Sequence, residues 1–248
     1  MNKIFKKYAF TVAEVLITLS IIGIVTSFII PKVKLKYQEI VTVSKVRKTY
    51  SVLNSSYQVA IRKYGSPKYW GLKVGKIDLD NNVSTFEDNE KFFLYLLEGL
   101  NYEYVKDKIP PQATNYLNNE DYSISNSDGF ERQPLFRLVD GVVFFHSWYN
   151  SSGCTAWGIN SCGDFSIDIN GAEGPNILGI DQFEFFYTES AIVPMGYSNH
   201  INKGGSSRTV ESHCRPKDKV SGNGYGCAAW VVEKGTMPWL YGKQASWN

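Results

Sequence analysis

The sequence predicts an α+β protein in which one long amino-terminal helix packs against an antiparallel sheet. Residues 10–30 form an apolar run with a single charge, and apolar residues then recur at helical spacing as far as Tyr64. Beyond residue 130, short alternating segments and the turn pair Asp140-Gly141 indicate strands joined by a hairpin. The 248 residues, 43% of them hydrophobic, suffice for one or two domains with a sizeable core.

The apolar run, residues 10–30, is long enough to cross a membrane. As a helix it would measure roughly 31 Å, the thickness of a bilayer's hydrocarbon core. Lysines precede the run and none lies inside it, which predicts a cytoplasmic amino terminus. The run is too long for a secretory signal and ends at Pro31 without a small-residue cleavage site. A plain signal anchor fits the length but has no use for Glu14, because burying a carboxylate in lipid is costly.

The stretch KKYAFTVAEVLITLSIIGIV closely resembles the amino-terminal signature of type IV pilins and of type II secretion pseudopilins. This resemblance implies that a prepilin peptidase removes residues 1–9 as a leader and that the exposed Phe10 is N-methylated. Ala9 stands before the cut, where the family usually has Gly, and its small side chain is compatible with cleavage. Glu14 matches the glutamate of the family motif, and Pro31 matches the proline that kinks the helix at the end of the membrane stretch.

The resemblance also implies a pilin-like fold, a single pass through the bacterial inner membrane and an extracytoplasmic carboxy-terminal domain. The expected function is that of a structural subunit polymerised into a type II secretion pseudopilus or a type IV pilus. The alternative is a minor pilin or membrane-anchored binding module whose carboxy-terminal domain recognises a glycan or a protein. The expected partners are the prepilin peptidase, sister subunits in a filament and the lipid of the inner membrane.

The charge of Glu14 has a physical interpretation beside the resemblance. Cleavage before Phe10 creates an ammonium group within the apolar zone, and Glu14 supplies a carboxylate one helical turn away, so the two charges could neutralise each other on one helix. Between neighbouring subunits this pair would fix the axial stagger, because any other register leaves a charge unpaired at low dielectric. The competing interpretation is a tolerated carboxylate that reaches toward the lipid headgroups.

Helical periodicity continues through residues 32–64, the predicted amphipathic continuation of the membrane helix at 10–31. Its spacing drifts from a strict heptad, so packing within its own domain is favoured over a coiled coil. Gly65-Ser66-Pro67 would end the helix, which places the globular domain at residues 65–248. The predicted apolar stripe comprises Val33, Tyr37, Ile40, Val43, Tyr50, Leu53, Tyr57, Ile61 and Tyr64.

Several shorter elements follow in the sequence. A second helix is predicted over Glu87–Leu100, capped by Asp88 or Asn89. GDFSIDI and QFEFFY alternate in the manner of half-buried strands, whereas CAAWVVEKG suits either a strand or a short helix. The residues of the second helix expected to face inward are Phe92, Leu94 to Leu97 and Leu100.

Four cysteines lie in the last hundred residues: Cys154, Cys162, Cys214 and Cys227. An even number of cysteines after a membrane-crossing segment indicates two disulfides in an oxidising compartment. Three pairings are possible, and short loops favour 154 with 162 and 214 with 227. The alternative is four reduced thiols that pack as small hydrophobes.

The loop GDFSIDINGAEGPNILGIDQF is the candidate metal site. Oxygen donors recur along it beside several glycines, and Ca²⁺ accepts such irregular sets of hard ligands. It is not an EF-hand, because Gly179 stands where that motif needs Glu. Major pseudopilins are similar in having a calcium-binding loop in this region, and Asp168, Asn170 and Asp181 would be the ligands. The somewhat favoured alternative is a turn that these side chains cap without a metal.

Composition and motifs argue against other functions. Without the three leader lysines, 23 basic residues face 24 acidic ones, so no basic footprint for nucleic acid exists. No nucleophile elbow or assigned nucleophile–histidine pair is present, so the protein is not expected to be an enzyme. His200, His213 and the cysteines lack zinc-ligand spacing, and no cofactor other than calcium is expected.

Overall fold

A computed structural model describes residues 11–72, 77–78, 83–84, 87–106, 108, 115–118, 134–149, 154–155, 160–171, 173–197, 208–220 and 222–247. The chain divides into two compact units, Met1–Glu39 and Ile40–Asn248. The second unit begins well before residue 65, where the predicted turn places the domain boundary. The last turns of the long helix are therefore part of the globular unit.

The long helix α1 spans Val12–Tyr64 without interruption, and Pro31 lies inside it. Its apolar residues before the globular unit are exposed, among them Ile22, Ile24 and Phe28. The predicted inward stripe is wrong at its start, because Val33, Tyr37 and Ile40 are more than half exposed. The kink at Pro31 stays a prediction.

Within the globular unit, α1 contributes one face to the core. The buried side chains of α1 are mostly three or four residues apart in the chain, which places them on one side of the helix. They include Thr49 and Ser56, which the predicted stripe omitted because it considered only apolar residues. The buried apolar set on α1 is Val43, Val46, Leu53, Tyr57 and Ala60.

The sheet is antiparallel, and its six strands lie in chain order, β3-β4-β5-β6-β7-β8. The predicted hairpin is confirmed: β4 and β5 pair antiparallel, and Leu138 and Val142 close the turn with a backbone hydrogen bond. A separate two-stranded pair joins β1 (Ile77–Asp78) to β2 (Val83–Ser84). The main strands are β3 (Tyr102–Tyr104), β4 (Phe136–Leu138), β5 (Val143–Tyr149), β6 (Ser161–Asp168), β7 (Gln182–Thr188) and β8 (Ile192–Pro194).

Short helices complete the globular unit. The second predicted helix exists as α2 (Glu87–Leu96), so Asp88 and Asn89 fall in its first turn rather than at its cap. Leu94 is half exposed, contrary to prediction, because four successive helical residues cannot all face one core. The ambiguous segment near residue 230 is the helix α5 (Cys227–Lys234). The others are η1 (Pro67–Tyr69), α4 (Val210–His213) and η3 (Pro238–Tyr241).

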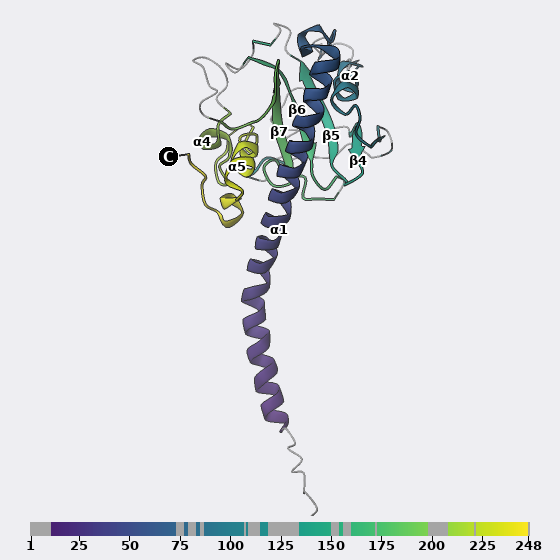
Figure 1. Ribbon diagram of the computed structural model, residues 1–248. Coiled ribbons are helices and arrows are strands. Elements are labelled where there is room, and N and C mark those ends of the chain that lie inside the picture. The colour runs from purple at the N-terminus through teal and green to yellow at the C-terminus, as the bar shows by residue number, and fades with distance from the viewer. Residues whose placement is uncertain are drawn as a thin grey trace, which may run out of the picture. The chain divides into compact units, whose positions relative to one another are not determined.

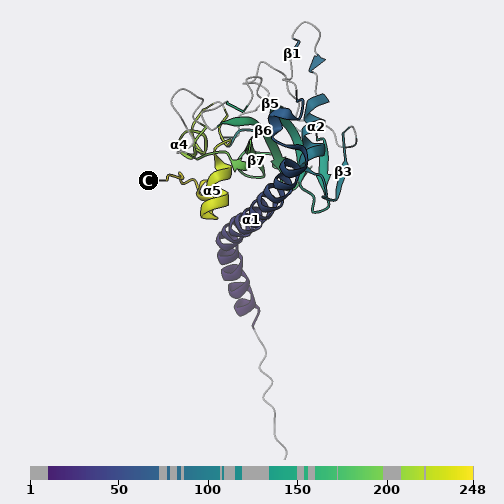
Figure 2. The same ribbon diagram turned by 45° about the horizontal axis from the view of Figure 1, so that its top comes forward.

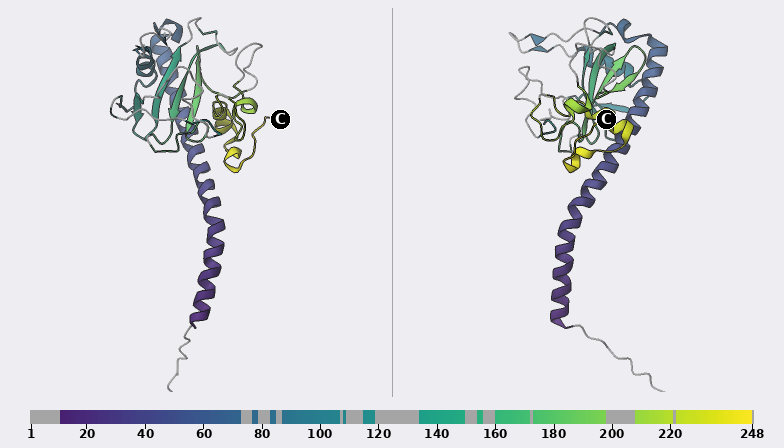
Figure 3. Two further views of the ribbon diagram at one scale, coloured as in Figure 1. Left: turned by 180° about the vertical axis from the view of Figure 1, so that it is seen from behind. Right: turned by 90° about the vertical axis from the view of Figure 1, so that its left-hand side faces the viewer.

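The sheet is covered on both faces. Helices α1 and α2 lie over one face, and α5 lies beside α1 (Figures 1 and 2). Between α2 and the sheet, aromatic rings pack closely, and Phe92 is tilted against Phe165 and stacked on Tyr187. The second half of α1 runs along one side of the sheet in the right-hand view of Figure 3, and segments from several parts of the chain contribute to the packing on the opposite face. A smaller apolar cluster there unites Tyr116, Leu178, Phe186, Met195 and Tyr225.

This double covering corrects the prediction of half-buried strands. Every residue of β6 is buried, and so is β7 except for its last residue. The polar positions that alternate with apolar ones bond across the strands instead of facing water. Ser166 Oγ donates to Glu184 Oε1 over 2.5 Å, and Gln182 Nε2 donates to Asp168 Oδ2 over 3.1 Å.

Polar side chains of α1 fasten the helix to backbone carbonyls of distant segments. Lys45 Nζ donates to the Ile169 oxygen over 3.1 Å, and the Tyr57 hydroxyl donates to the Thr188 oxygen over 2.5 Å. The Arg47 guanidinium donates to the last carbonyls of α5, those of residues 232 and 233, over 2.8 and 2.9 Å. Each contact satisfies a backbone acceptor that would otherwise need water.

Candidate functional site

Glu14 lies in the first turn of α1 and is held by Thr11, the residue just before the helix. The Thr11 backbone N–H and hydroxyl both donate to Glu14 Oε2 over 2.8 Å. In return, the Glu14 backbone N–H donates to Thr11 Oγ1 over 3.2 Å. This reciprocal arrangement is a capping box, and it supplies partners at the start of the helix, where backbone N–H groups lack them.

The capping box changes the interpretation of Glu14. The sequence analysis paired the carboxylate with the amine at Phe10, of its own chain or of a neighbouring subunit, whereas the structure shows Thr11 as a partner within its own chain. The signal was present in the sequence as Thr-Val-Ala-Glu, residues 11–14, since Thr followed three residues later by Glu is the capping-box pattern. Pairing with a neighbouring subunit stays a prediction.

The surface around Glu14 is apolar. Val12 is 76% exposed, and Leu16 and Ile17 are each 59% exposed, so the carboxylate stands in an uncovered hydrophobic helix surface. Within the described residues, α1 is the one helix long and apolar enough to span a membrane, and its apolar window is not buried in the protein. The length and composition of this helix are those of a single-pass membrane anchor.

The other predicted assembly and processing residues are placed only in part. Pro31 lies inside α1 and its side chain is exposed. Ala9 and Phe10 lie outside the described residues, as does the rest of the predicted leader.

The three predicted metal ligands lie together at the end of β6 and the start of β7. Asp168 Oδ1 accepts the backbone N–H groups of Asn170 and Gly171, each over 2.9 Å. Asp181 accepts the N–H groups of Asn176 and Ile177 over 2.8 and 2.7 Å. The side chains thus shape the loop as turn caps, which is the metal-free role that the sequence also predicts.

Negative charge is nevertheless poorly compensated in this loop. Burial raises the pKa of the Asp168 carboxyl to about 7, and the nearby Asp181 carboxylate adds to the rise, against the effect of the N–H donors. Burial likewise raises the pKa of Asp181. A positive charge between or beside two acids whose pKa values are raised by burial would stabilise their ionised forms.

The donor chemistry of the loop fits a hard cation. The side-chain oxygens of Asn170 and Asn176 are buried and have no hydrogen-bond partner within the described part of the chain. Buried oxygens without partners are uncommon, and amide and carboxylate oxygens are what Ca²⁺ prefers. Asp168, Asn170 and Asp181 therefore suit calcium, with Asn176 as a donor that the sequence analysis did not select.

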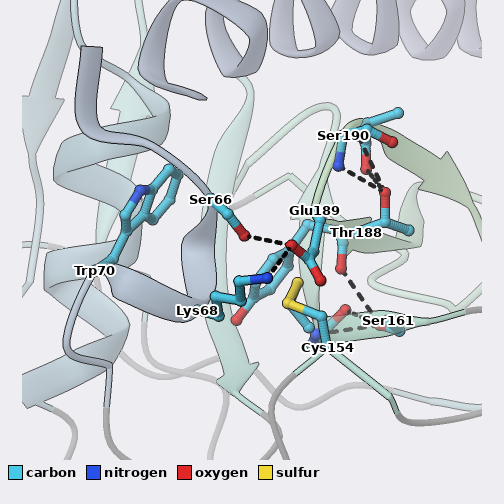
Figure 4. The surroundings of a disulfide bond; sticks show 12 residues. Ser66, Lys68, Trp70, Cys154, Ser161, Thr188, Glu189 and Ser190 are labelled. Atoms are coloured by element: carbon cyan, nitrogen blue, oxygen red, sulfur yellow. Dashed lines mark hydrogen bonds and ion pairs between the residues drawn. A yellow bond between two sulfur atoms is a disulfide. The ribbon is translucent and has the colours of Figure 1, made fainter. Parts of the chain in front are cut away.

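The four cysteines form two disulfides, Cys154–Cys162 and Cys214–Cys227, the two pairs that close short loops. The first fixes the start of β6 next to Glu189, which accepts hydrogen bonds from Ser66 and Lys68 (Figure 4). The second joins the end of α4 to the start of α5. Because both sulfurs of each pair are bonded, the cysteines are not available as thiolate ligands for zinc.

A serine–histidine contact in α4 was not anticipated from the sequence. Ser212 Oγ lies 2.8 Å from His213 Nδ1, but it also completes a capping box with Thr209 at the start of α4. The two residues are chain neighbours within one short helix, and a capping role accounts for the serine hydroxyl.

No family model, curated protein or solved structure gives a significant match to this chain. Function is therefore inferred from the chain's own residues.

Proposed function

We propose that the protein is a pilin-like structural subunit. A prepilin peptidase would remove residues 1–9, and the processed chain would polymerise into a type II secretion pseudopilus or a type IV pilus. The observation that supports this most is a lone carboxylate, Glu14, at the start of an exposed apolar helix that continues into a globular unit. A membrane anchor alone explains the apolar surface but gives no reason for a charged residue in it, because an uncharged side chain such as glutamine could also cap the helix.

Assembly would exchange lipid for sister helices around the apolar half of α1. Helices in a membrane gain little from hydrophobicity when they associate, so close packing and polar contacts must supply the specificity. The ammonium group at Phe10 of one subunit would pair with Glu14 of the next, and it would reject registers that leave either charge alone.

The location follows from the same features. Before assembly the subunit would lie in the bacterial inner membrane with a cytoplasmic amino terminus, and the globular unit would be extracytoplasmic. Two disulfides support this side for the globular unit, because disulfides persist outside the reducing cytoplasm.

The test separates the charge of Glu14 from its capping role. Glu14→Gln keeps an acceptor for Thr11 but removes the charge, while Glu14→Ala removes both. In the native host, both variants should be processed before Phe10, as mass spectrometry would show, and both should fail to enter filaments. Wild-type filament levels for Glu14→Gln would contradict assembly through the carboxylate and would leave the membrane-anchored binding module.

Calcium is the second part of the proposal. Asp168, Asn170 and Asp181 would hold the ion. Its positive charge would balance the carboxylates of Asp168 and Asp181, whose pKa values burial raises. Thermal unfolding of the Ile40–Asn248 unit should then shift upward in calcium and downward in chelator. The Asp181→Asn variant serves as the control that should not respond. An unchanged midpoint in the unmodified unit would reject a structural ion.

A further inference from the structure

Thr11 determines how the Glu14 side chain is oriented. Its N–H and its hydroxyl converge on a single carboxylate oxygen, Oε2, at 2.8 Å each. The backbone N–H of Glu14 donates to the same hydroxyl oxygen, so three hydrogen bonds link the two residues. Among the described residues, none donates to the other carboxylate oxygen, Oε1.

The rest of the helix surface cannot replace this contact. The next hydroxyls along α1, those of Thr18 and Ser20, donate to carbonyls of their own helix, Val15 and Leu16, over 2.9 and 2.8 Å. The side chains that flank Glu14 are apolar and exposed. Thr11 is therefore the polar group in this region of the described helix that engages the carboxylate.

A carboxylate held at one oxygen can still accept at the other, because each oxygen has two lone pairs. Fixing the side chain before a partner arrives reduces the conformational entropy lost on pairing. The position at the start of a helix also favours the ionised form, since backbone N–H groups there carry partial positive charge.

We propose that Thr11 is a positioning residue for Glu14. It occupies Oε2 and presents Oε1 to the ammonium group of a neighbouring copy of this chain. The inference rests on the proposed function, because the cut before Phe10 supplies that ammonium group. It adds that the hydroxyl of Thr11, and not only the charge of Glu14, sets the efficiency of assembly.

The experiment compares Thr11→Val with Thr11→Ser in the full-length precursor, expressed in the native host. Valine keeps the shape of threonine without the hydroxyl, and serine keeps the hydroxyl. Both variants should lose the leader, as seen by mass spectrometry of the membrane fraction. The ratio of assembled to membrane-resident protein should fall about fivefold for Thr11→Val, the scale of a lost cap, and should stay within about twofold for Thr11→Ser.

A second measurement does not depend on assembly. In detergent micelles, hydrogen exchange at the Thr11 amide should be slow in the wild type and fast in Glu14→Ala, because Glu14 is the acceptor for that amide. Equal exchange in the two proteins would overturn the hydrogen bond on which the inference depends.

The outcomes distinguish the inference from the proposed function. If Glu14→Gln fails to assemble while Thr11→Val assembles at the wild-type level, the role of Thr11 is wrong and the proposed function stands. If both variants assemble at the wild-type level, both ideas fall. Equal losses in Thr11→Ser and Thr11→Val would show that side-chain shape matters rather than the hydroxyl, and would also overturn the inference.

Discussion

Asp168 stabilises the fold through its hydrogen bonds and destabilises it through the buried charge of its ionised carboxylate. Its carboxylate organises the loop by accepting two backbone N–H groups and the amide of Gln182. The same burial that makes these bonds strong makes its charge unfavourable, with Asp181 nearby. Binding a proton or a cation therefore stabilises the folded loop, because it reduces the buried negative charge.

This raised pKa predicts how stability depends on pH in the absence of calcium. The folded-state pKa of Asp168, about 7, exceeds its ordinary value of 3.8, so the folded protein binds the proton more tightly. The associated stability is complete below about pH 4 and is lost as the pH rises to about 7, by up to about 4 kcal/mol. Asp168→Asn should flatten this decline. Urea unfolding of the Ile40–Asn248 unit in chelator measures the free energy of unfolding between pH 5 and 7. If this free energy declines equally in the wild type and in Asp168→Asn, the raised pKa does not belong to Asp168.

Two glycines with positive φ provide a matched comparison of backbone geometry. A Cβ at Gly196 (φ 129°) would lie 2.1 Å from the oxygen of Gly226, whereas a Cβ at Gly99 (φ 79°) meets nothing within 4 Å. Gly196→Ala should therefore destabilise the protein by more than about 2 kcal/mol beyond the effect of Gly99→Ala, because backbone cannot move aside cheaply. Chemical denaturation of both variants tests this. Equal losses of stability would mean that the backbone at Gly196 and the backbone at Gly226 are not in close contact.

At the scale of elements, the Arg47 side chain of α1 binds the end of α5. The Arg47 guanidinium donates to two carbonyls at the end of α5, and Gly235 makes room for it, since a Cβ there would lie 2.7 Å from a guanidinium nitrogen. A cation at the carboxy-terminal end of a helix also interacts favourably with the helix dipole.

Arg47→Met should therefore loosen α5 before it affects the sheet. The expected loss is about 1–2 kcal/mol, because two exposed hydrogen bonds to a charged donor disappear while most of the side-chain volume stays. Hydrogen exchange should accelerate first in residues 227–234. Arg62→Met, at another exposed position on α1, is the control and should change little. Uniform acceleration across the unit would show that α5 does not open separately.

The elements were predictable where local chemistry decides them. Asp140-Gly141 specified its hairpin because few residues adopt the backbone of that turn. Alternation in β6 and β7 correctly indicated strands but misled about burial, because Ser166 and Glu184 satisfy each other inside the protein. A polar residue paired across strands cannot be told from a solvent-facing one in the sequence.

At the scale of the whole molecule, the globular unit includes the second half of α1. The boundary near residue 40 places residues 40–64 of this helix in the globular unit, and several of their side chains belong to its core. Tyr57, for example, is fully buried and stacks edge-on with Trp70 while its hydroxyl bonds to the end of β7.

A truncation series tests this boundary. A fragment beginning at Ile40 should unfold cooperatively, whereas one beginning at Gly65 should not fold. The shorter fragment lacks several buried apolar side chains worth about 1.5–3 kcal/mol each, which together approach the usual stability of a domain. Near-ultraviolet circular dichroism and thermal unfolding compare the two. A sharp transition in the Gly65 fragment would contradict the placement of α1 in the core.

The sequence by itself determined the membrane-length apolar helix, the carboxylate within it, the α+β class and the short-loop pairing of cysteines as the favoured one. These features depend on composition and on residues close together in the chain. Only the tertiary structure decided which stretch of α1 is buried, that both faces of the sheet are covered, and that Asp168 and Asp181 share one buried loop. Those outcomes depend on contacts between distant segments, and the energy of a buried charge depends on what surrounds it.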